Sequence, residues 1–360
     1  MSPSSSQEAA SVSLSDEDRY FNSNPPPKCL DEHMTLVNKF LDRHAKANRR
    51  VVLVTSGGTT VPLERQTVRF IDNFSAGTRG ATSAEYFLDD EADYAVIFLH
   101  RQFSLQPYSR HYSHATDGFL DFLTEDEHGI RARDQDATAL LCVLRRYRAA
   151  RDRLLALPFV TITDYLFELR AISRAMHRVG SNGLLYLAAA VSDFFLPPER
   201  MSEHKIQSTD IQLDSEKSAV RNEDEEEAFD NFDSSPNIPR SKRLVIDLDP
   251  VPKFLKNLVD NWSPQCMVIS FKLETDPQLL IVKAKGALDR YQHNLVIGNL
   301  LSTRKHEVVF VTPDAVDWLR LNEKDLAANI EIEGRIVPQV VSLHDKHIQH
   351  VQKAKAEGVV

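Results

Sequence analysis

The segment from Arg50 to Leu88 limits the possible folds of this chain more than any other stretch. It opens with Val51 to Val54, a continuous apolar run typical of a strand buried on both faces of a parallel sheet. Two adjacent glycines in the stretch 56–59 then allow a tight turn. A second loop, 73–80, leads directly into a predicted small-residue helix from about Thr78 to Leu88. This order of strand, loop and helix predicts a Rossmann-like α/β fold.

The second loop has the spacing of a phosphate-binding loop. Gly77 and Gly80 keep the latter part of a dinucleotide fingerprint, and Ser75 stands where its first glycine would be. Unpaired N–H groups and the helix dipole favour a phosphate at such a helix start. However, the acid expected about twenty residues further on is replaced by His100 and Arg101. We therefore predict a nucleotide rather than NAD as the ligand, and a tight turn needed only for helix packing remains the alternative.

Composition excludes several classes of protein. The chain has 360 residues, 42% of them hydrophobic and 26% charged, as is ordinary for a globular protein. A net charge of −9 gives no reason to expect nucleic-acid binding. No apolar run reaches the roughly 20 residues that span a bilayer, and the N-terminus lacks the pattern of a secretory signal. We expect no membrane association and a cytoplasmic location, with the nucleus possible.

The three cysteines, Cys29, Cys142 and Cys266, are too few and too scattered to predict a disulfide framework or a metal cluster. Residues 1–20 are rich in serine and acids and are predicted to be disordered.

Predicted strands and helices alternate along the rest of the chain. This alternation predicts a doubly wound, mostly parallel sheet with helices on both faces, in a single domain over 21–360. The expected strands are at 94–99, 159–162, 184–193, 244–248, 267–271, 295–297 and 307–311. The expected helices are at 30–48, 138–155, 164–179, 252–262, 276–292 and 342–355. We interpret 101–158 as an insertion or cover and 207–241 as a disordered acidic insert without a catalytic role.

Asp193 follows an apolar strand that narrows to alanines. The carboxyl ends of parallel strands are where open α/β sheets bind ligands, and alanines leave room for one. We therefore expect Asp193 to contact a ligand, although a helix cap or a surface acid would also fit.

Three blocks of sequence together resemble phosphopantothenate–cysteine ligase in its eukaryotic form. The blocks are TSGGTTVPLERQTVRFIDNFSAGTRGATSAE, then YLAAAVSDFFLPPERMSEHKIQS, and then DPVPKFL with SFKLETDP and VIGNLL. They span most of the chain from Arg50 to about Thr312 and lie in the order of that family. The resemblance implies a ligase of coenzyme A biosynthesis that joins phosphopantothenate to cysteine through an acyl-nucleotide intermediate and releases pyrophosphate. Because both nucleophiles belong to the substrates, such an enzyme needs no catalytic triad.

The resemblance also implies roles for individual residues. The residues matching the nucleotide site are Gly57, Ser75, Gly77, Gly80, Lys205, Phe271, Lys285 and Asn299. The residues matching the phosphopantothenate site are Asn73, Ala189, Ala190, Asp193 and Arg69. Asn73 corresponds to the catalytic asparagine of the family, and Lys205 to a mobile lysine that neutralises the triphosphate. Arg69 could equally brace the loop, and bacterial relatives place the acid that matches Asp193 nearer the nucleotide.

Departures from the bacterial pattern bear on the co-substrate. A second lysine of the bacterial enzymes is replaced by Asp289, which favours ATP over CTP. Mg²⁺ is implied as the partner of the triphosphate, with Asp193 and Glu274 as candidate ligands. The family also implies a homodimer, and a separate phosphopantothenoylcysteine decarboxylase as a possible partner. Two other hypotheses remain open at this stage: an NADP-dependent reductase, suggested by His100 and Arg101, and a non-catalytic nucleotide-binding scaffold.

Overall fold

The computed structural model describes residues 15–113, 118–206 and 244–358, which form two compact units. The larger one, called the sheet unit below, comprises Pro27–Val61, Ile71–Ser192 and Leu255–Val360. The other, called the small unit, comprises Met1–Pro26, Pro62–Phe70 and Asp193–Phe254. The acidic insert predicted at 207–241 lies outside the described residues.

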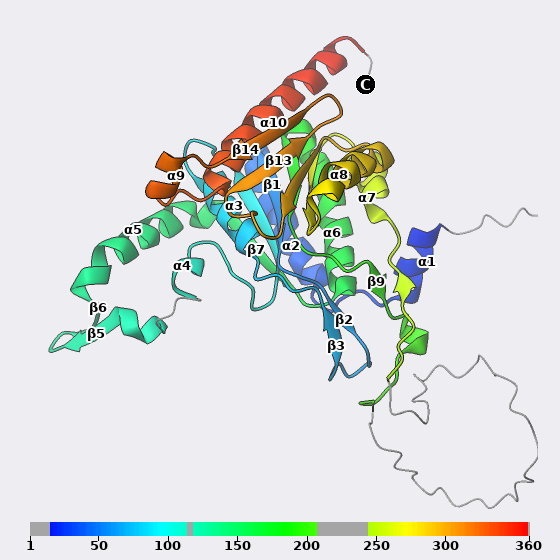
Figure 1. Cartoon of the computed structure of the whole chain (residues 1–360), viewed down its shortest axis with the longest axis horizontal. Coiled ribbons are helices and arrows are strands. Elements are labelled where there is room, and N and C mark those ends of the chain that lie inside the picture. Colours follow the sequence, from blue (N-terminus) through cyan, green and yellow to red (C-terminus); the bar gives the residue numbers. More distant parts are fainter. Residues whose placement is uncertain (1–14, 114–117, 207–243, 359–360) are drawn as a thin grey trace, which may run out of the picture. The chain divides into compact units, whose positions relative to one another are not determined.

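The sheet unit is organised around one eight-stranded sheet in the order β14-β13-β12-β11-β8-β1-β4-β7 (Figure 1). The strands from β12 to β7 pair in parallel, and β13 and β14 are antiparallel to their neighbours. The bounds are β1 Val51–Ser56, β4 Ala95–Arg101, β7 Leu154–Phe159, β8 Gly183–Leu187, β11 Met267–Glu274, β12 Leu295–Leu300, β13 Glu307–Val311 and β14 Val316–Arg320. The predicted mostly parallel α/β fold is therefore confirmed. The strand order reverses direction between β1 and β8, the position at which open α/β sheets bind ligands.

Helices cover both faces of this sheet. On one face, α3 and α10 pack against alternate residues of β1, β4, β8, β11, β12 and β13 and form the larger buried cluster. On the opposite face, α8 packs against β12 and β13. Helix α2 packs against α6. The main helices are α2 Leu30–Lys46, α3 Thr78–Leu88, α5 Asp134–Ala150, α6 Ile162–Met176, α8 Pro277–Tyr291 and α10 Glu333–Ala356. The shorter elements are β2 Thr60–Pro62, β3 Phe70–Asp72, α4 Arg110–Ser113, β5 Leu123–Asp126, β6 Gly129–Ala132, α7 Phe254–Asn257 and α9 Glu323–Ala327.

Local sequence explains why the first strand and helix form where they do. The side chains of Val51 to Val54 are fully buried, as expected for a central parallel strand. In α3, the small side chains of Ala81 and Ala84 are fully buried against the sheet, so this helix can lie close to β1 and β4. Helix α8 starts as predicted, because the Asp276 side chain accepts a hydrogen bond from the Gln278 N–H and Pro277 occupies the first turn.

The small unit contains helix α1 (Asp16–Ser23) and the paired strands β9 (Phe194–Phe195) and β10 (Asp249–Pro250). The expectation of disorder through residue 20 is wrong for its last residues. Ser15 caps α1, and the ring of Tyr20 packs on Phe195 and Phe254 at centroid distances of 4.9 and 5.4 Å. The burial of these rings orders a segment that composition alone predicts to be disordered.

Several predicted boundaries differ from the structure. The strand expected at 159–162 is β7, Leu154–Phe159, because Thr161 already caps α6 and ends the extended backbone. The helix of the 101–158 segment ends earlier than expected, at Ala150, because a 3₁₀ turn follows at Arg151–Arg153 and β7 begins at Leu154. The strand expected at 184–193 ends at Leu187.

Three further differences from the predicted elements lie in the last third of the chain. No strand forms over the described residues 244–248, and β14 was not predicted. Helix α10 begins at Glu333, nine residues before the predicted start, with Pro338 in its interior. The burial of Ile336, Val337 and Val340 against the sheet compensates for the hydrogen bond that the proline cannot donate.

Candidate active site

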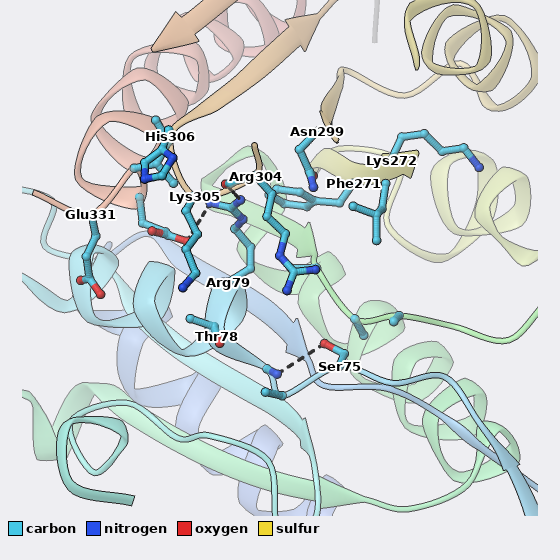
Figure 2. Close-up of a pocket in the computed structure, with 18 of the residues that line it drawn as sticks. Ser75, Thr78, Arg79, Phe271, Lys272, Asn299, Arg304, Lys305, His306 and Glu331 are labelled. Carbon is cyan, nitrogen blue, oxygen red and sulfur yellow. Dashed lines mark hydrogen bonds and ion pairs between the residues drawn. The ribbon is translucent and has the colours of Figure 1, made fainter. Parts of the chain in front are cut away.

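A pocket of about 850 Å³ lies in the sheet unit, beside the carboxyl ends of β8, β11 and β12 (Figure 2). It is lined by the loop before α3, the first turn of α3, the residues after β8, the ends of β11 and β12, and the segments 304–306 and 329–333. This is the edge at which open α/β sheets bind ligands.

The loop before α3 is held against the end of β1 by close backbone packing. The Asn73 N–H donates to the Thr59 carbonyl at 3.1 Å. A Cβ atom added to Gly58 would lie only 1.6 Å from the Asn73 carbonyl oxygen, so only glycine allows this approach. Gly80 similarly makes room for Ser56, whose hydroxyl would lie 2.4 Å from an added Cβ.

The start of α3 offers backbone donors to the pocket. Gly77 is the N-cap residue and has φ of 82°, a conformation that favours glycine. Its N–H donates weakly to the Ser75 hydroxyl at 3.4 Å, and its carbonyl accepts from the Ser56 hydroxyl at 3.0 Å. The following residues, Thr78 and Arg79, line the pocket. The N–H groups of this first turn have no helical acceptors, so an anion placed here would be stabilised.

Basic side chains dominate the charge of the pocket. Its two lining carboxylates are neutralised: Glu333 pairs with Arg79 at 2.7 Å, and Glu331 accepts two hydrogen bonds from Arg110 at 2.7 and 2.8 Å. Arg304 and Lys305 line the same pocket, and neither forms an ion pair within the described residues. In Figure 2 their side chains extend toward Thr78 and Ser75 at the start of α3. The pocket is thus suited to a multiply charged anion.

The wall that carries Glu331 is fixed by a buried ion-pair network. Glu85 of α3 accepts hydrogen bonds from the Tyr108 N–H at 2.7 Å, Arg110 Nε at 2.7 Å and His111 Nε2 at 3.0 Å. Burial by itself would raise the pKa of Glu85, but these donors outweigh it and hold the pKa at about 2. Arg110 therefore bridges two carboxylates and connects α3 to the pocket wall at Glu331.

The pocket brings together about half of the residues predicted for the site. The predicted residues that line it are Asn73, Ser75, Gly77, Ala189, Ala190, Phe271 and Asn299. The backbones of both alanines are tied to the β1 end of the sheet: the Ala189 N–H donates to the Thr55 hydroxyl at 3.2 Å and the Ala190 N–H to the Gly57 carbonyl at 2.8 Å. Phe271 packs edge-on against Tyr186 with its centroid 5.0 Å away.

The other predicted residues lie elsewhere. Gly57 has φ of 85° and packs against Arg101, and Gly80 packs against Ser56, so both shape the loops without lining the pocket. Lys285 lies on the exposed side of α8 and does not line it either.

Arg69, Asp193 and Lys205 belong to the small unit. There the fully buried Glu64 carboxylate accepts from the backbone and guanidinium of Arg69 and from the Ile206 N–H, next to the exposed Lys205. Burial opposes ionisation of Glu64, but these hydrogen bonds keep its pKa below the ordinary value. The Asp193 side chain is 81% exposed and lies 3.8 Å from Lys253.

Sequence reasoning missed the basic residues of the pocket. They are Arg79, Lys272, Arg304, Lys305 and His306. One available signal was the run Arg304-Lys305-His306, which lies between two predicted strands at the sheet edge where the ligand was expected.

The groups that suggested a reductase are engaged in other contacts. His100 is buried, and its Nδ1 lies 2.9 Å from the Arg101 carbonyl oxygen. The Arg101 guanidinium pairs with Asp72 at 2.7 Å. Neither is therefore placed as a free cation for the extra phosphate of NADP.

Among the helices of the described residues, none has the length and hydrophobicity of a membrane-spanning segment.

Comparisons with known proteins identify the family. No family model matches the sequence. Phosphopantothenate–cysteine ligase CAB2 of Saccharomyces cerevisiae is 46% identical over 342 residues, which cover 93% of this chain and 87% of that protein. The human phosphopantothenate–cysteine ligase is 39% identical over 332 residues, covering 90% and 96%. A solved structure of a Cab2 mutant in complex with phosphopantothenate-cysteine matches with a TM-score of 0.80 and 44% identity, covering 93% of this chain and 99% of that one. Because this identity extends over nearly the whole of both chains, the chain belongs to the phosphopantothenate–cysteine ligase family.

Proposed function

We propose that this protein joins phosphopantothenate to L-cysteine at the expense of a nucleoside triphosphate, with ATP favoured over CTP. The observation that carries the proposal is the pocket itself. It combines the free N–H groups at the start of α3, two unpaired cations at Arg304 and Lys305, and the aromatic side chain of Phe271. These groups suit a triphosphate and its base, and they lie beside the loop that carries Asn73.

The reaction would proceed in two substitutions. A carboxylate oxygen of phosphopantothenate attacks the α-phosphorus, and pyrophosphate leaves with the electron pair of the broken P–O bond. The cysteine amine then attacks the acyl carbon, an amide forms, the amine gives up a proton, and the nucleoside monophosphate leaves with one carboxylate oxygen. In both steps the protein positions the reactants and stabilises negative charge.

Asn73 is the proposed catalytic residue of this sequence. Its backbone contacts Gly58 and Thr59 in the turn that follows β1. A neutral amide at this position can donate a hydrogen bond to the developing negative charge without repelling the substrate carboxylate. The role that the resemblance implies for Lys205, neutralising the triphosphate, stays a proposal, and the exposed side chain of this lysine is consistent with it.

Mg²⁺ fits this pocket as the partner of the triphosphate rather than as a protein-held ion. The lining carboxylates Glu331 and Glu333 are both paired with arginines. Glu274, considered above as a ligand, contacts Lys283 at 2.8 Å and Lys272 at 3.5 Å. When bound, the metal would neutralise charge on the phosphates and hold their oxygens in a reactive arrangement.

The apolar residues of the segment 101–158 support the proposal of a homodimer. Phe119, Leu120 and Ile130 are 58%, 76% and 79% exposed in this chain. Burying them between subunits would remove apolar surface from water. Light scattering of the purified protein tests this assembly.

A cytoplasmic location and a complex with a separate decarboxylase are further proposals. Fluorescence imaging tests the location, and co-purification tests the complex.

Isotope transfer tests the proposed chemistry directly. Phosphopantothenate whose carboxylate carries heavy oxygen is incubated with the enzyme, cysteine and ATP, and the products are analysed by mass spectrometry. One heavy oxygen in AMP, together with pyrophosphate, is the expected result. Formation of ADP and phosphate, or AMP without label, would refute the acyl-nucleotide route. A parallel assay with CTP measures the nucleotide preference.

A further inference from the structure

A second cluster of reactive side chains lies between α2 and α6, within the sheet unit. Cys29 is the residue before α2 and His33 lies one helical turn further on, so both can face the same side of the helix. Glu168 extends toward them from α6. Its Oε1 atom lies 2.7 Å from His33 Nδ1 and 3.9 Å from Cys29 Sγ. All three donor atoms lie within 4.8 Å of one another.

The carboxylate of Glu168 is incompletely satisfied by these neighbours. Its side chain is 1% exposed, and its second oxygen, Oε2, has no hydrogen-bond partner among the described residues. Burial raises the pKa of Glu168 although His33 opposes the shift. A buried carboxylate oxygen without a hydrogen-bond donor is destabilising, so Glu168 Oε2 is expected to need a partner that the described residues do not supply.

The three donor types are those that bind zinc. Thiolate sulfur, imidazole nitrogen and carboxylate oxygen bind Zn²⁺ at about 2.0–2.3 Å, which places neighbouring donor atoms of a tetrahedral site about 3.3–3.7 Å apart. The two separations from Glu168 Oε1, 2.7 and 3.9 Å, lie on either side of this range, and the Cys29 and His33 donor atoms lie within 4.8 Å of each other. Small side-chain rotations would therefore open the cluster around an ion, and Glu168 can offer the unpartnered Oε2.

We propose that Cys29, His33 and Glu168 form a binding site for Zn²⁺ that ties the start of α2 to α6. Three protein ligands leave a fourth position, which a water molecule can occupy because Cys29 is only partly buried. Binding would release the thiol proton of Cys29 and requires the neutral imidazole of His33. The ion would stabilise the folded state, because the unfolded chain does not hold these three groups together.

Cobalt substitution of the full-length protein tests this site. The protein is freed of metal with a chelator under reducing conditions and titrated with Co²⁺, whose spectrum reports both thiolate ligation and tetrahedral geometry. One equivalent should produce a thiolate-to-cobalt absorption band together with intense visible bands, and Zn²⁺ should abolish both. Zn²⁺ should also raise the melting temperature.

Two variants and one control make the result specific. Cys29→Ser should lose the thiolate band and the zinc-dependent rise in melting temperature, and Glu168→Gln, which keeps the side-chain shape, should weaken binding. Cys142→Ser is the matched control and should behave as the wild type, because that cysteine is exposed on α5. Absence of the thiolate band at one equivalent, or its persistence in Cys29→Ser, would overturn the proposal and leave a simple His33–Glu168 hydrogen bond.

Discussion

The contact between Gly58 and Asn73 provides a direct test of how the fold positions the site. In Gly58→Ala, the new Cβ would lie 1.6 Å from the Asn73 carbonyl oxygen and 2.8 Å from its carbonyl carbon. Since such contacts below 3.0 Å are essentially never seen, Gly58 and the Asn73 loop must separate by about 1.4 Å. Gly58 does not have a positive φ, so alanine brings no backbone strain of its own. The main expected perturbation is therefore a change in the distance between Gly58 and the Asn73 backbone.

A displacement of about 1 Å at a reacting centre can reduce the rate about 100-fold, which corresponds to about 2.7 kcal/mol of transition-state stabilisation. We expect kcat/KM of Gly58→Ala, measured by release of AMP or pyrophosphate, to fall by about this factor. Circular dichroism should show a folded protein. The matched control is Gly286→Ala on α8, where an added Cβ meets nothing within 4 Å. It should retain full activity and gain up to about 1 kcal/mol of stability. Wild-type kcat/KM in folded Gly58→Ala would refute the argument that this contact positions Asn73.

Three other changes test the site and its supports. Asn73→Asp should lower the rate of acyl-nucleotide formation at least about 100-fold, because a carboxylate repels the substrate carboxylate, and rapid-quench analysis measures this step. Replacing Arg304 and Lys305 together by glutamine should raise the KM for the nucleotide at least about tenfold, whereas Lys346→Gln on α10, outside the pocket, should leave it unchanged. The pKa of Glu85 in the folded protein is lowered from 4.5 to about 2. The ionised Glu85 carboxylate therefore stabilises the folded state fully above pH 4.5, and this stabilisation is lost as the pH falls toward 2. Urea unfolding should show wild type losing up to about 3 kcal/mol across this range, and a similar loss in Glu85→Gln would contradict the assignment.

The sequence alone determined the architecture, because in the main strands and helices the residues at the element ends and the spacing of apolar residues indicate the same secondary structure. The apolar run of β1 and the Asp276–Pro277 start of α8 each specify their element without help from distant residues. The glycine loop before α3 was also visible, since its spacing is a local property. The three blocks of family resemblance added the function, and the comparisons confirm the family.

Tertiary structure decided the features that depend on residues far apart in the chain. Burial of Val337 and Val340 overrides the helix-breaking tendency of Pro338, so α10 starts earlier than the local pattern predicts. Contacts among aromatic rings order α1 despite its polar surroundings. In both cases the energy comes from packing against distant segments, which no window of local sequence contains.

The chemistry of the sites shows the same division. Asn73 and Phe271 were found from motifs, but Arg304 and Lys305 became visible as pocket residues only when β12 and β13 placed their loop opposite α3. Glu168 lies 139 residues beyond Cys29, and only the packing of α6 on α2 brings the two together. Periodicity encodes which residues are buried, whereas a binding site requires convergence of side chains from several elements, and that convergence is set by the folded chain as a whole.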